Sequence, residues 1–451
     1  MNLRPYQQQL ITDIRLQYQL GKRSVLAVLP TGGGKTYIFS HIAQAAAKKG
    51  NRVCILVHRS ELLDQASSAL TGMGVKHGRI QANRAMDLSH AVQVASVQTL
   101  ARRLHKLPTG FFQLLVVDEA HHTNAGQWVM VLQHFQQAHV LGVTATPIRG
   151  DGRGLGEWYQ AMVQGPSGAW LTDNGYLASA RVLAPPGFDA AGLRKRMGDF
   201  DPKQAEQRVT TIMGDCVSHY RKHLSGQTAI AFCCSVAHAE AVAALFNASG
   251  IAAASIDGTM DTATRRHLLE QLGAGRIKIL TSCALIGEGV DVPSVGGCIL
   301  LRPTQSVSLH LQMIGRCLRP SPGKPAAVVL DHVGNTLRLG HHLEERDWSL
   351  DGIKKRDREK APSVKVCPVC FATNATGASY CCECQHQFRA EVRELKQVDG
   401  ELQELTTRQR RREQGSAQSL EDLRQLAQQR GYRRGWAERV YEARLAKRHG
   451  I

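Results

Sequence analysis

The sequence predicts an α/β fold made of two tandem parallel-sheet domains, followed by a small cysteine-rich module and a helical tail. Short apolar runs alternate with helical stretches in two successive halves of the chain, which is the pattern of parallel sheets. Five of the 12 cysteines lie between Cys367 and Cys384. The length of 451 residues fits about three domains at roughly 150 residues each.

The first predicted domain, residues 1–185, contains five apolar runs with the length of buried strands. The segment Lys35–Lys49 has helical character, and Gly50 is a suitable helix terminator. The glycine-rich stretch at 149–158 follows the last run and is expected to form a loop. The five runs are 24–29, 52–57, 91–96, 114–118 and 140–144.

The second predicted domain, residues 186–345, repeats this alternation of apolar runs and helical stretches. Helical windows at 236–249, 261–273 and 306–318 separate its apolar runs, so it is expected to form a second parallel sheet. A polar linker is expected at 346–363, the cysteine-rich module at 364–390 and a basic helical tail at 391–451. The runs of the second half are 228–232, 252–256, 277–282, 297–301 and 326–331.

Charge and apolar patterning narrow the class of protein. The chain has 56 Lys and Arg against 38 Asp and Glu, a net charge of +18, which favours a polyanion such as a nucleic acid as partner. No run of 18 apolar residues predicts a spanning helix, and the N-terminus lacks the apolar core of a signal peptide. We therefore expect a cytoplasmic protein without a membrane segment.

A phosphate-binding loop is predicted between the first strand and the first helix. In the sequence LPTGGGKT at 29–36, glycines allow backbone N–H groups to wrap phosphates, Lys35 supplies positive charge, and the Thr36 hydroxyl can bind Mg²⁺. Leu29 departs from the general pattern, which has glycine at that position. The loop residues Thr31, Gly32, Gly33 and Gly34 are therefore candidates for ATP binding.

An acidic pair ends a later strand of the same half. Asp118 and Glu119 follow the apolar run LLVV, roughly 80 residues after the phosphate-binding loop. In phosphoryl transfer one carboxylate can hold Mg²⁺ and the other can orient the attacking water. The sequence therefore predicts Asp118 as a magnesium ligand and Glu119 as the catalytic residue that orients the attacking water.

These motifs, in this order, resemble those of superfamily 2 helicases over about residues 1–335. The phosphate-binding loop, DEAH at 118–121 and TATP at 144–147 resemble motifs I, II and III. RPYQ at 4–7 resembles the adenine-reading motif, and VHRSELLDQ at 57–65 resembles motif Ia. Thr281 with GEGVDVP at 287–293 resembles motif V, and QMIGRCLRP at 312–320 resembles motif VI.

The resemblance implies two RecA-like domains with ATP between them. It implies Gln312, Arg316 and Arg319 as second-domain groups near the γ-phosphate, with Arg319 as the arginine finger. Arg316 and Arg319 are expected on one face of a helix, because they lie three residues apart. The other implied groups are Arg4, Gln7, Gly289 and Asp291 for the nucleotide, His121, Thr144 and Thr146 for coupling, and Arg59, Gln98 and Thr281 for nucleic acid.

Within the superfamily the chain is most similar to the RadD-like and phage-type DNA helicases. The shared features are the LRPYQ opening, the run LRPTQSVSL at 301–309 and a downstream cysteine module. DNA is the expected substrate, with repair or phage and mobile-element proteins as further partners. The alternatives are an RNA helicase or RNP remodeller, and a nucleic-acid binder with a decayed ATPase, which the intact motifs oppose.

The cysteine module predicts a structural zinc site. Cys367 and Cys370 form one CxxC pair, and Cys381 and Cys384 form a second after ten intervening residues, which is the spacing of a four-thiolate site. Cys382 is expected to be the spare thiol. Four thiolate ligands leave no open position on the metal, so the zinc is expected to stabilise the module and to take no part in catalysis.

The tail is expected to form a helical hairpin. Ser419 can cap a helix that has acidic residues in its first turn, Gly431 would end it, and a second helix would restart at about Trp436. Tyr432 and Trp436 can either stack on nucleic-acid bases or form the core of the hairpin.

Overall fold

The computed structural model describes most of the chain, which divides into two compact units, Met1–Arg389 and Ala390–Ile451. The described residues are 3–123, 126–149, 152–184, 192–196, 199–210, 213–283, 295–324, 326–352, 364–388, 417, 419–429, 431–432 and 435–448. None of the helices in these ranges is long and apolar enough to cross a membrane.

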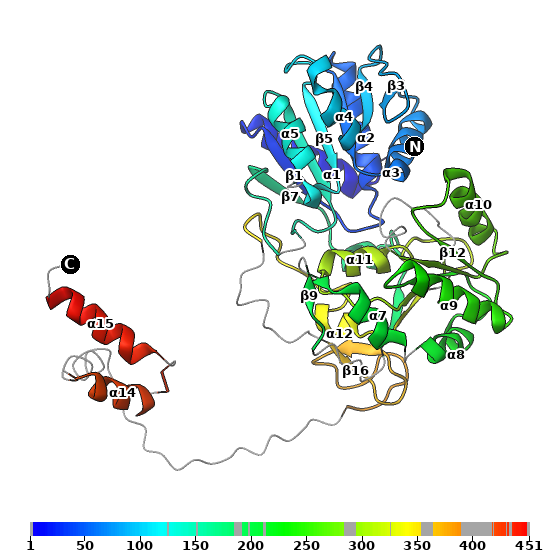
Figure 1. The fold of residues 1–451 in the computed structure, drawn as a ribbon. Helices are drawn as coiled ribbons and strands as arrows, with labels where there is room; N and C mark the ends of the chain where they lie inside the picture. Colours follow the sequence, from blue (N-terminus) through cyan, green and yellow to red (C-terminus); the bar gives the residue numbers. More distant parts are fainter. Residues whose placement is uncertain are drawn as a thin grey trace. The chain divides into compact units, whose positions relative to one another are not determined.

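A seven-stranded parallel sheet forms the first domain (Figure 1). The strand order is β3-β4-β2-β5-β6-β1-β7. Its strands are β1 (Ser24–Val28), β2 (Val53–Val57), β3 (His77–Ile80), β4 (Val92–Ser96), β5 (Leu114–Asp118), β6 (His139–Thr144) and β7 (Ala161–Gln164). Its helices are α1 (Pro5–Gln19), α2 (Lys35–Lys48), α3 (Ser60–Gly72), α4 (Val97–Arg103), α5 (Gly126–His134) and α6 (Gly168–Asp173), with short 3-10 turns at Leu104–Lys106 and Ala120–His122.

Burial on both faces explains why the central strands are apolar throughout. In β1, Val25 and Ala27 belong to one buried cluster, whereas Leu26 and Val28 belong to the cluster on the other side of the sheet. Since neighbouring residues of a strand point to opposite faces, a strand that is covered twice needs an apolar residue at each position.

A six-stranded parallel sheet forms the second domain, in the order β12-β13-β11-β14-β15-β8. Its strands are β8 (Ala180–Leu183), β11 (Ala229–Phe232), β12 (Ala253–Ile256), β13 (Ile279–Ser282), β14 (Gly297–Leu300) and β15 (Ala327–Asp331), and a small ribbon adds β9 (Lys195–Arg196) and β10 (Asp199–Phe200). The helices are α7 (Pro202–Thr210), α8 (Met213–His223), α9 (Val236–Ala248), α10 (Thr262–Gly273), α11 (Val307–Gly315) and α12 (Asn335–Leu339). The predicted fold of two tandem parallel sheets is confirmed.

The predicted strands are all present within two residues of their expected bounds, but three edge strands are additional. β3, β7 and β8 lie at the edges of their sheets, where fewer positions are covered and polar residues are tolerated. β8 lies before residue 185 yet pairs with β15 of the second sheet. We therefore propose that the chain passes to the second domain between Gln164 and Ala180, earlier than the expected boundary.

The cysteine module attaches to this edge strand. It consists of a hairpin of β16 (Val364–Val366) and β17 (Thr373–Ala375) and a second cysteine turn. The Ala184 amide donates to the Phe371 carbonyl at 3.1 Å, and Thr373 Oγ1 donates to the Val182 carbonyl at 3.1 Å. An ion pair of 2.7 Å joins Arg181 Nε to Glu383 Oε2. These contacts hold the module on the second domain.

Residues 341–352 form a strap that leaves the second domain after α12 and crosses to the first. Trp348 and Leu350 pack against an apolar cluster of the first domain, and the Gly156 amide donates to the Leu350 carbonyl at 2.9 Å. Arg153 and Gly352 form an antiparallel bridge. A Cβ atom at Gly154 would overlap the Leu350 carbonyl oxygen, so the predicted glycine-rich loop is the seat of the strap.

The tail unit contains the predicted hairpin of α14 (Leu420–Gln429) and α15 (Trp436–Arg448). The Asp422 amide donates to Ser419 Oγ at 3.0 Å, which confirms the expected cap. The Tyr432 and Trp436 ring centroids lie 4.5 Å apart, and Arg424 Nε lies 2.9 Å from Glu438 Oε1 across the hairpin. The two aromatic residues therefore contact each other within the hairpin.

The seat of the strap gives a first prediction. Gly154→Val should displace residues 346–352, because the new side chain meets the strap backbone. Amide hydrogen exchange of a peptide covering 340–352 should then rise by about tenfold or more. The control is Gly258→Val, where a Cβ atom has open space around it. Unchanged exchange in a folded Gly154→Val protein would show that the strap does not need this close approach.

Candidate active site

The predicted first-domain motifs meet at one edge of the first sheet. The phosphate-binding loop follows β1, Asp118 ends β5, and Thr144 ends β6, and these three strands are neighbours in parallel order. Because the carboxyl ends of parallel strands lie at the same edge, residues far apart in the sequence converge there. Figure 1 shows α11 of the second domain at the side that faces this edge.

Each glycine of the phosphate-binding loop has little space for a side chain. Gly32 and Gly34 both have φ of +87°, a conformation that favours glycine. A Cβ atom at Gly32 would lie 2.7 Å from Leu177 Cδ2, and one at Gly34 would overlap the amide of Gln7. The loop is thus kept narrow, with backbone N–H groups at the start of α2, as a phosphate cradle requires.

The packing of Leu29 explains why this position holds leucine where the general motif has glycine. Its side chain is buried, and it occupies the space beside Gly33 and Gly165, where added Cβ atoms would each lie 2.7 Å from Leu29 carbons. The glycine expected at the start of the loop is therefore replaced by a side chain that packs against the loop.

Glu119 has a strained backbone. Its φ of 50° and ψ of 56° lie in the left-handed region, which costs a non-glycine residue about 1–3 kcal/mol. The neighbouring Asp118 carboxylate accepts the Glu119 amide at 3.0 Å, and both residues are buried, with 6% and 7% of their surface exposed. Such strain commonly occurs at functional sites because the surrounding structure imposes it.

Helix α11 packs directly on the phosphate-binding loop. A Cβ atom at Gly315 would lie 2.5 Å from Thr31 Cγ2, so this approach requires glycine. Gln312 is buried one turn earlier, and its Nε2 has no hydrogen-bond partner within the described part of the protein. An acceptor on a bound nucleotide would satisfy that amide.

The two arginines lie in the segment after α11, not together on the helix as predicted. The helix ends at Gly315, three residues short of its expected end, and Arg316 is its C-cap. Arg319 precedes Pro320, a position that disfavours helical geometry. A Cβ atom at Gly32 would lie 4.0 Å from Arg319 Cγ, so Arg319 is beside the phosphate-binding loop. Burial lowers the pKa of Arg319 from its ordinary value, although nearby Tyr37 opposes the shift.

The predicted coupling residues are in mutual contact. His121 Nδ1 lies 3.5 Å from Glu119 Oε2 and 3.2 Å from Thr144 Oγ1. Thr144 Oγ1 donates to the Thr146 carbonyl at 2.9 Å and accepts the Thr146 amide at 3.1 Å. The acidic pair and the TATP segment thus form a connected polar network.

The predicted adenine-reading residues touch the phosphate-binding loop. Gln7 Nε2 and the Tyr6 hydroxyl both donate to the Gly33 carbonyl, at 3.2 and 2.9 Å. Arg4 lies 4.8 Å over the Tyr176 ring, and Trp170 stacks on Tyr176 with centroids 5.9 Å apart. The sequence analysis missed Trp170 and Tyr176. Neither residue belongs to one of the predicted motifs, so no sequence signal pointed to them.

The residues predicted to face nucleic acid differ in accessibility. Arg59 is partly exposed as the N-cap of α3, while Gln98 Nε2 donates to the His58 carbonyl at 3.0 Å. Thr281 is fully buried, and its hydroxyl donates to the Ala239 carbonyl at 2.7 Å. The candidates Gly289 and Asp291 lie outside the described residues.

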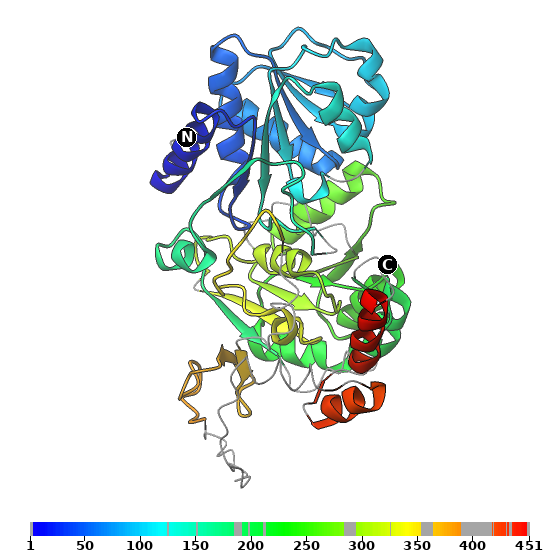
Figure 2. The same ribbon diagram turned by 90° about the vertical axis from the view of Figure 1, so that its left-hand side faces the viewer.

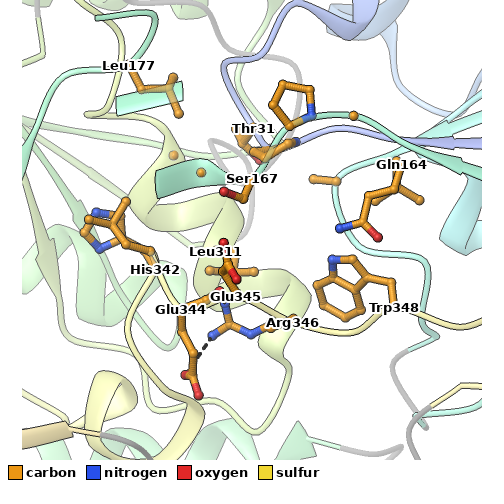
Figure 3. Close-up of a pocket in the computed structure, with 18 of the residues that line it drawn as sticks. Thr31, Gln164, Ser167, Leu177, Leu311, His342, Glu344, Glu345, Arg346 and Trp348 are labelled. Atoms are coloured by element: carbon orange, nitrogen blue, oxygen red, sulfur yellow. Dashed lines mark hydrogen bonds and ion pairs between the residues drawn. The ribbon is translucent and has the colours of Figure 1, made fainter. Parts of the chain in front are cut away.

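A cavity of about 260 Å³ lies between the domains beside the phosphate-binding loop (Figure 3). Thr31 lines it from the first domain, Leu311 and Gly315 line it from α11, and the strap contributes His342 and Trp348. The cavity therefore opens where both domains and the strap meet.

The second cysteine pair converges on the first. Sγ atoms of Cys367 and Cys384 lie 3.5 Å apart, as do those of Cys370 and Cys381, and all four lie within 4.8 Å of one another. Tetrahedral coordination with bonds of about 2.3 Å requires thiolates at comparable separations. Cys382 is not part of this group. The geometry fits a structural Zn²⁺ held by the four predicted ligands.

The fold and the ordered motifs identify the chain as a superfamily 2 helicase of the DEAD/DEAH type, an ATP-hydrolysing enzyme. The family model "Type III restriction enzyme, res subunit" matches residues 1–149, and "Helicase conserved C-terminal domain" matches residues 211–321.

Relatives that match across both sheet domains support this assignment. The chain is 33% identical to a 51.5 kDa protein of a Lactococcus phage, over 83% of this chain and 80% of that protein. It is 30% identical to a Saccharomyces cerevisiae protein named as the ATP-dependent helicase IRC3, over 74% of this chain but only 51% of the relative. A solved fragment named as an HsdR subunit of a type I restriction enzyme from Vibrio vulnificus has the same fold, with a TM-score of 0.61, 23% identity and coverage of 74% of this chain and 65% of that fragment.

The cysteine cluster gives a second prediction. The protein should bind one Zn²⁺ per chain, and Cys367→Ser should lose both the metal and the order of the module, because three thiolates remain. Cys382→Ser is the matched control and should retain zinc. Metal analysis of protein purified without chelators measures the zinc content of the wild type and of both variants. Absence of zinc from the wild-type protein would contradict the site.

Proposed function

We propose that the protein is an ATP-driven DNA translocase or helicase that hydrolyses ATP between its two RecA-like domains. The observation that carries the proposal is the packing of α11 on the phosphate-binding loop. Gly315 lies against Thr31 and Arg319 lies beside Gly32, which supports a site to which Gln312 and Arg319 would contribute from the second domain. Site residues from both domains would then surround the phosphates, so that hydrolysis depends on the approach of the domains.

The first domain would bind and activate the nucleotide. Lys35 and the loop residues Thr31–Gly34 would hold the β- and γ-phosphates, and Thr36 with Asp118 would hold Mg²⁺, which neutralises phosphate charge when it is bound. Glu119 would orient the attacking water. Arg4 and Gln7 would lie near the adenine, and we add Trp170, of which 42% is exposed, as an apolar surface for the base.

The second domain would complete the site. Gln312 would contact the γ-phosphate or the attacking water, Arg316 would sense the γ-phosphate, and Arg319 would act as the arginine finger. Asp291 would contact the ribose, with Gly289 in the same motif. His121, Thr144 and Thr146 would transmit the nucleotide state to the domain interface.

DNA is the proposed substrate. The net charge of +18 favours a nucleic acid, and the similar proteins named as restriction enzymes belong to a class that acts on DNA. Arg59 would contact the phosphate backbone, whereas partly exposed Gln98 and buried Thr281 would support that surface. A repair or phage and mobile-element setting agrees with the phage relative, and its proteins would be further partners. RNA remains the second candidate substrate, since helicase motifs grip mainly phosphate and sugar.

A comparison of cofactors tests the proposed substrate. ATP turnover should rise more with single-stranded or forked DNA than with RNA, and Glu119→Gln should retain ATP binding but hydrolyse slowly, since the water-orienting carboxylate is lost. Steady-state ATPase assays and nucleotide-binding titrations measure the two effects. Stronger stimulation by RNA would favour the second candidate, and wild-type turnover in Glu119→Gln would remove Glu119 from the site.

Arg319 gives a separate prediction. Arg319→Ala should lower kcat by about 10³–10⁵-fold with little change in ATP affinity, because an arginine finger acts mainly in the transition state. Single-turnover hydrolysis and equilibrium binding of ATP separate these effects. A defect confined to ATP binding would contradict the role.

A further inference from the structure

We propose that Ser308 is a positioning residue that links the catalytic network of the first domain to α11 of the second. The inference rests on the proposed ATPase function and adds a residue that lies outside the helicase motifs. Thr146 Oγ1 donates to Ser308 Oγ at 2.6 Å. Thr146 is fully buried and Ser308 is 7% exposed, so this bond crosses the domain interface away from solvent.

The bond extends the polar network that begins at Glu119. From the carboxylate the contacts pass to His121, to the Thr144 hydroxyl and to both the amide and carbonyl of Thr146. The Thr146 hydroxyl then contacts Ser308. A movement of Glu119 can therefore be transmitted to the second domain through a continuous series of polar contacts.

The helix geometry connects Ser308 to the second-domain site residues. Ser308 and Gln312 lie four residues apart on α11 and thus on the same face, and Arg316 follows four residues later as the C-cap. An anchor at Ser308 fixes the start of α11, while Gly315 fixes its end against Thr31. Two points of attachment determine where Gln312 lies relative to the phosphate-binding loop.

The hydroxyl of Ser308 is not needed to start the helix. Ser306 performs that role, because its Oγ accepts the Leu309 amide at 3.2 Å. When the domains separate, water replaces this bond, so the bond gives the closed arrangement the modest net stabilisation of a buried hydrogen bond. The bond therefore favours the closed arrangement, in which the site residues of both domains are assembled.

A double-mutant cycle tests the role. ATP hydrolysis with single-stranded DNA is measured for Ser308→Ala, Thr146→Val and the double variant, with Ser308→Thr as the variant that keeps the hydroxyl. The control is Ser255→Ala, at a second-domain hydroxyl that has no hydrogen-bond partner among the described residues. We expect Ser308→Ala to lower kcat by about tenfold or more and to change the KM for ATP by less than about twofold. Ser308→Thr should retain most of the rate, and Ser255→Ala should match the wild type.

The double variant distinguishes coupling from general destabilisation. If the two hydroxyls act together, the double variant should lose no more rate than the worse single variant, whereas independent effects multiply. Losses in rate that multiply in the double variant, or a wild-type kcat in Ser308→Ala, would overturn the proposal.

Thermal melts check folding, and if Ser308→Ala unfolds, Ser308→Cys replaces it in the same cycle. Failure of all nucleic acids to stimulate the wild type would refute the proposed function, and the cycle on the basal rate would still test Ser308.

Discussion

The close approach of α11 to the phosphate-binding loop is the contact on which the rest of the site depends. Gly315 makes the approach possible, since any larger residue would meet Thr31. Because helices are rigid over this length, one contact at the end of α11 determines the position of Gln312 within it, while Arg319 lies beyond the helix, beside Gly32. In the proposed mechanism the site is completed by the approach of the two domains, and a small separation would move Gln312 and Arg319 away from the phosphate-binding loop together.

The first domain adds a constraint of its own at the acidic motif. The parallel sheet brings the ends of β1, β5 and β6 to one edge, but the chain must turn sharply after β5 to keep Glu119 there. The turn places Glu119 in a left-handed conformation that an unsupported residue would leave. The Asp118 carboxylate holds the Glu119 amide, and His121 lies beside the Glu119 carboxylate, so the strained turn and the polar network support each other.

Much of this architecture could be predicted because its signals are local. Strands covered on both faces are continuous apolar runs, and the motifs for phosphate, acid pair and thiolates are short in sequence. The edge strands β3, β7 and β8 were missed, because they are short and contain polar residues. Leu29 as the support of the loop, the end of α11 at Gly315, and the Trp170 and Tyr176 pair depend on contacts between distant segments, which no pattern in a single sequence reveals.

The path of the chain after α12 gives the two domains a second connection. The strap crosses to the glycine-rich seat of the first domain, and the cysteine module that follows residue 363 is held on β8 of the second. The chain thus touches the second domain, then the first, then the second again. Any opening of the nucleotide site must either carry the strap with one domain or detach it from its seat. The strap also lines the cavity beside Thr31. A change in the attachment of the strap would therefore change this cavity next to the phosphate-binding loop. The glycine-rich loop that holds the strap is thus part of the connection between the two domains.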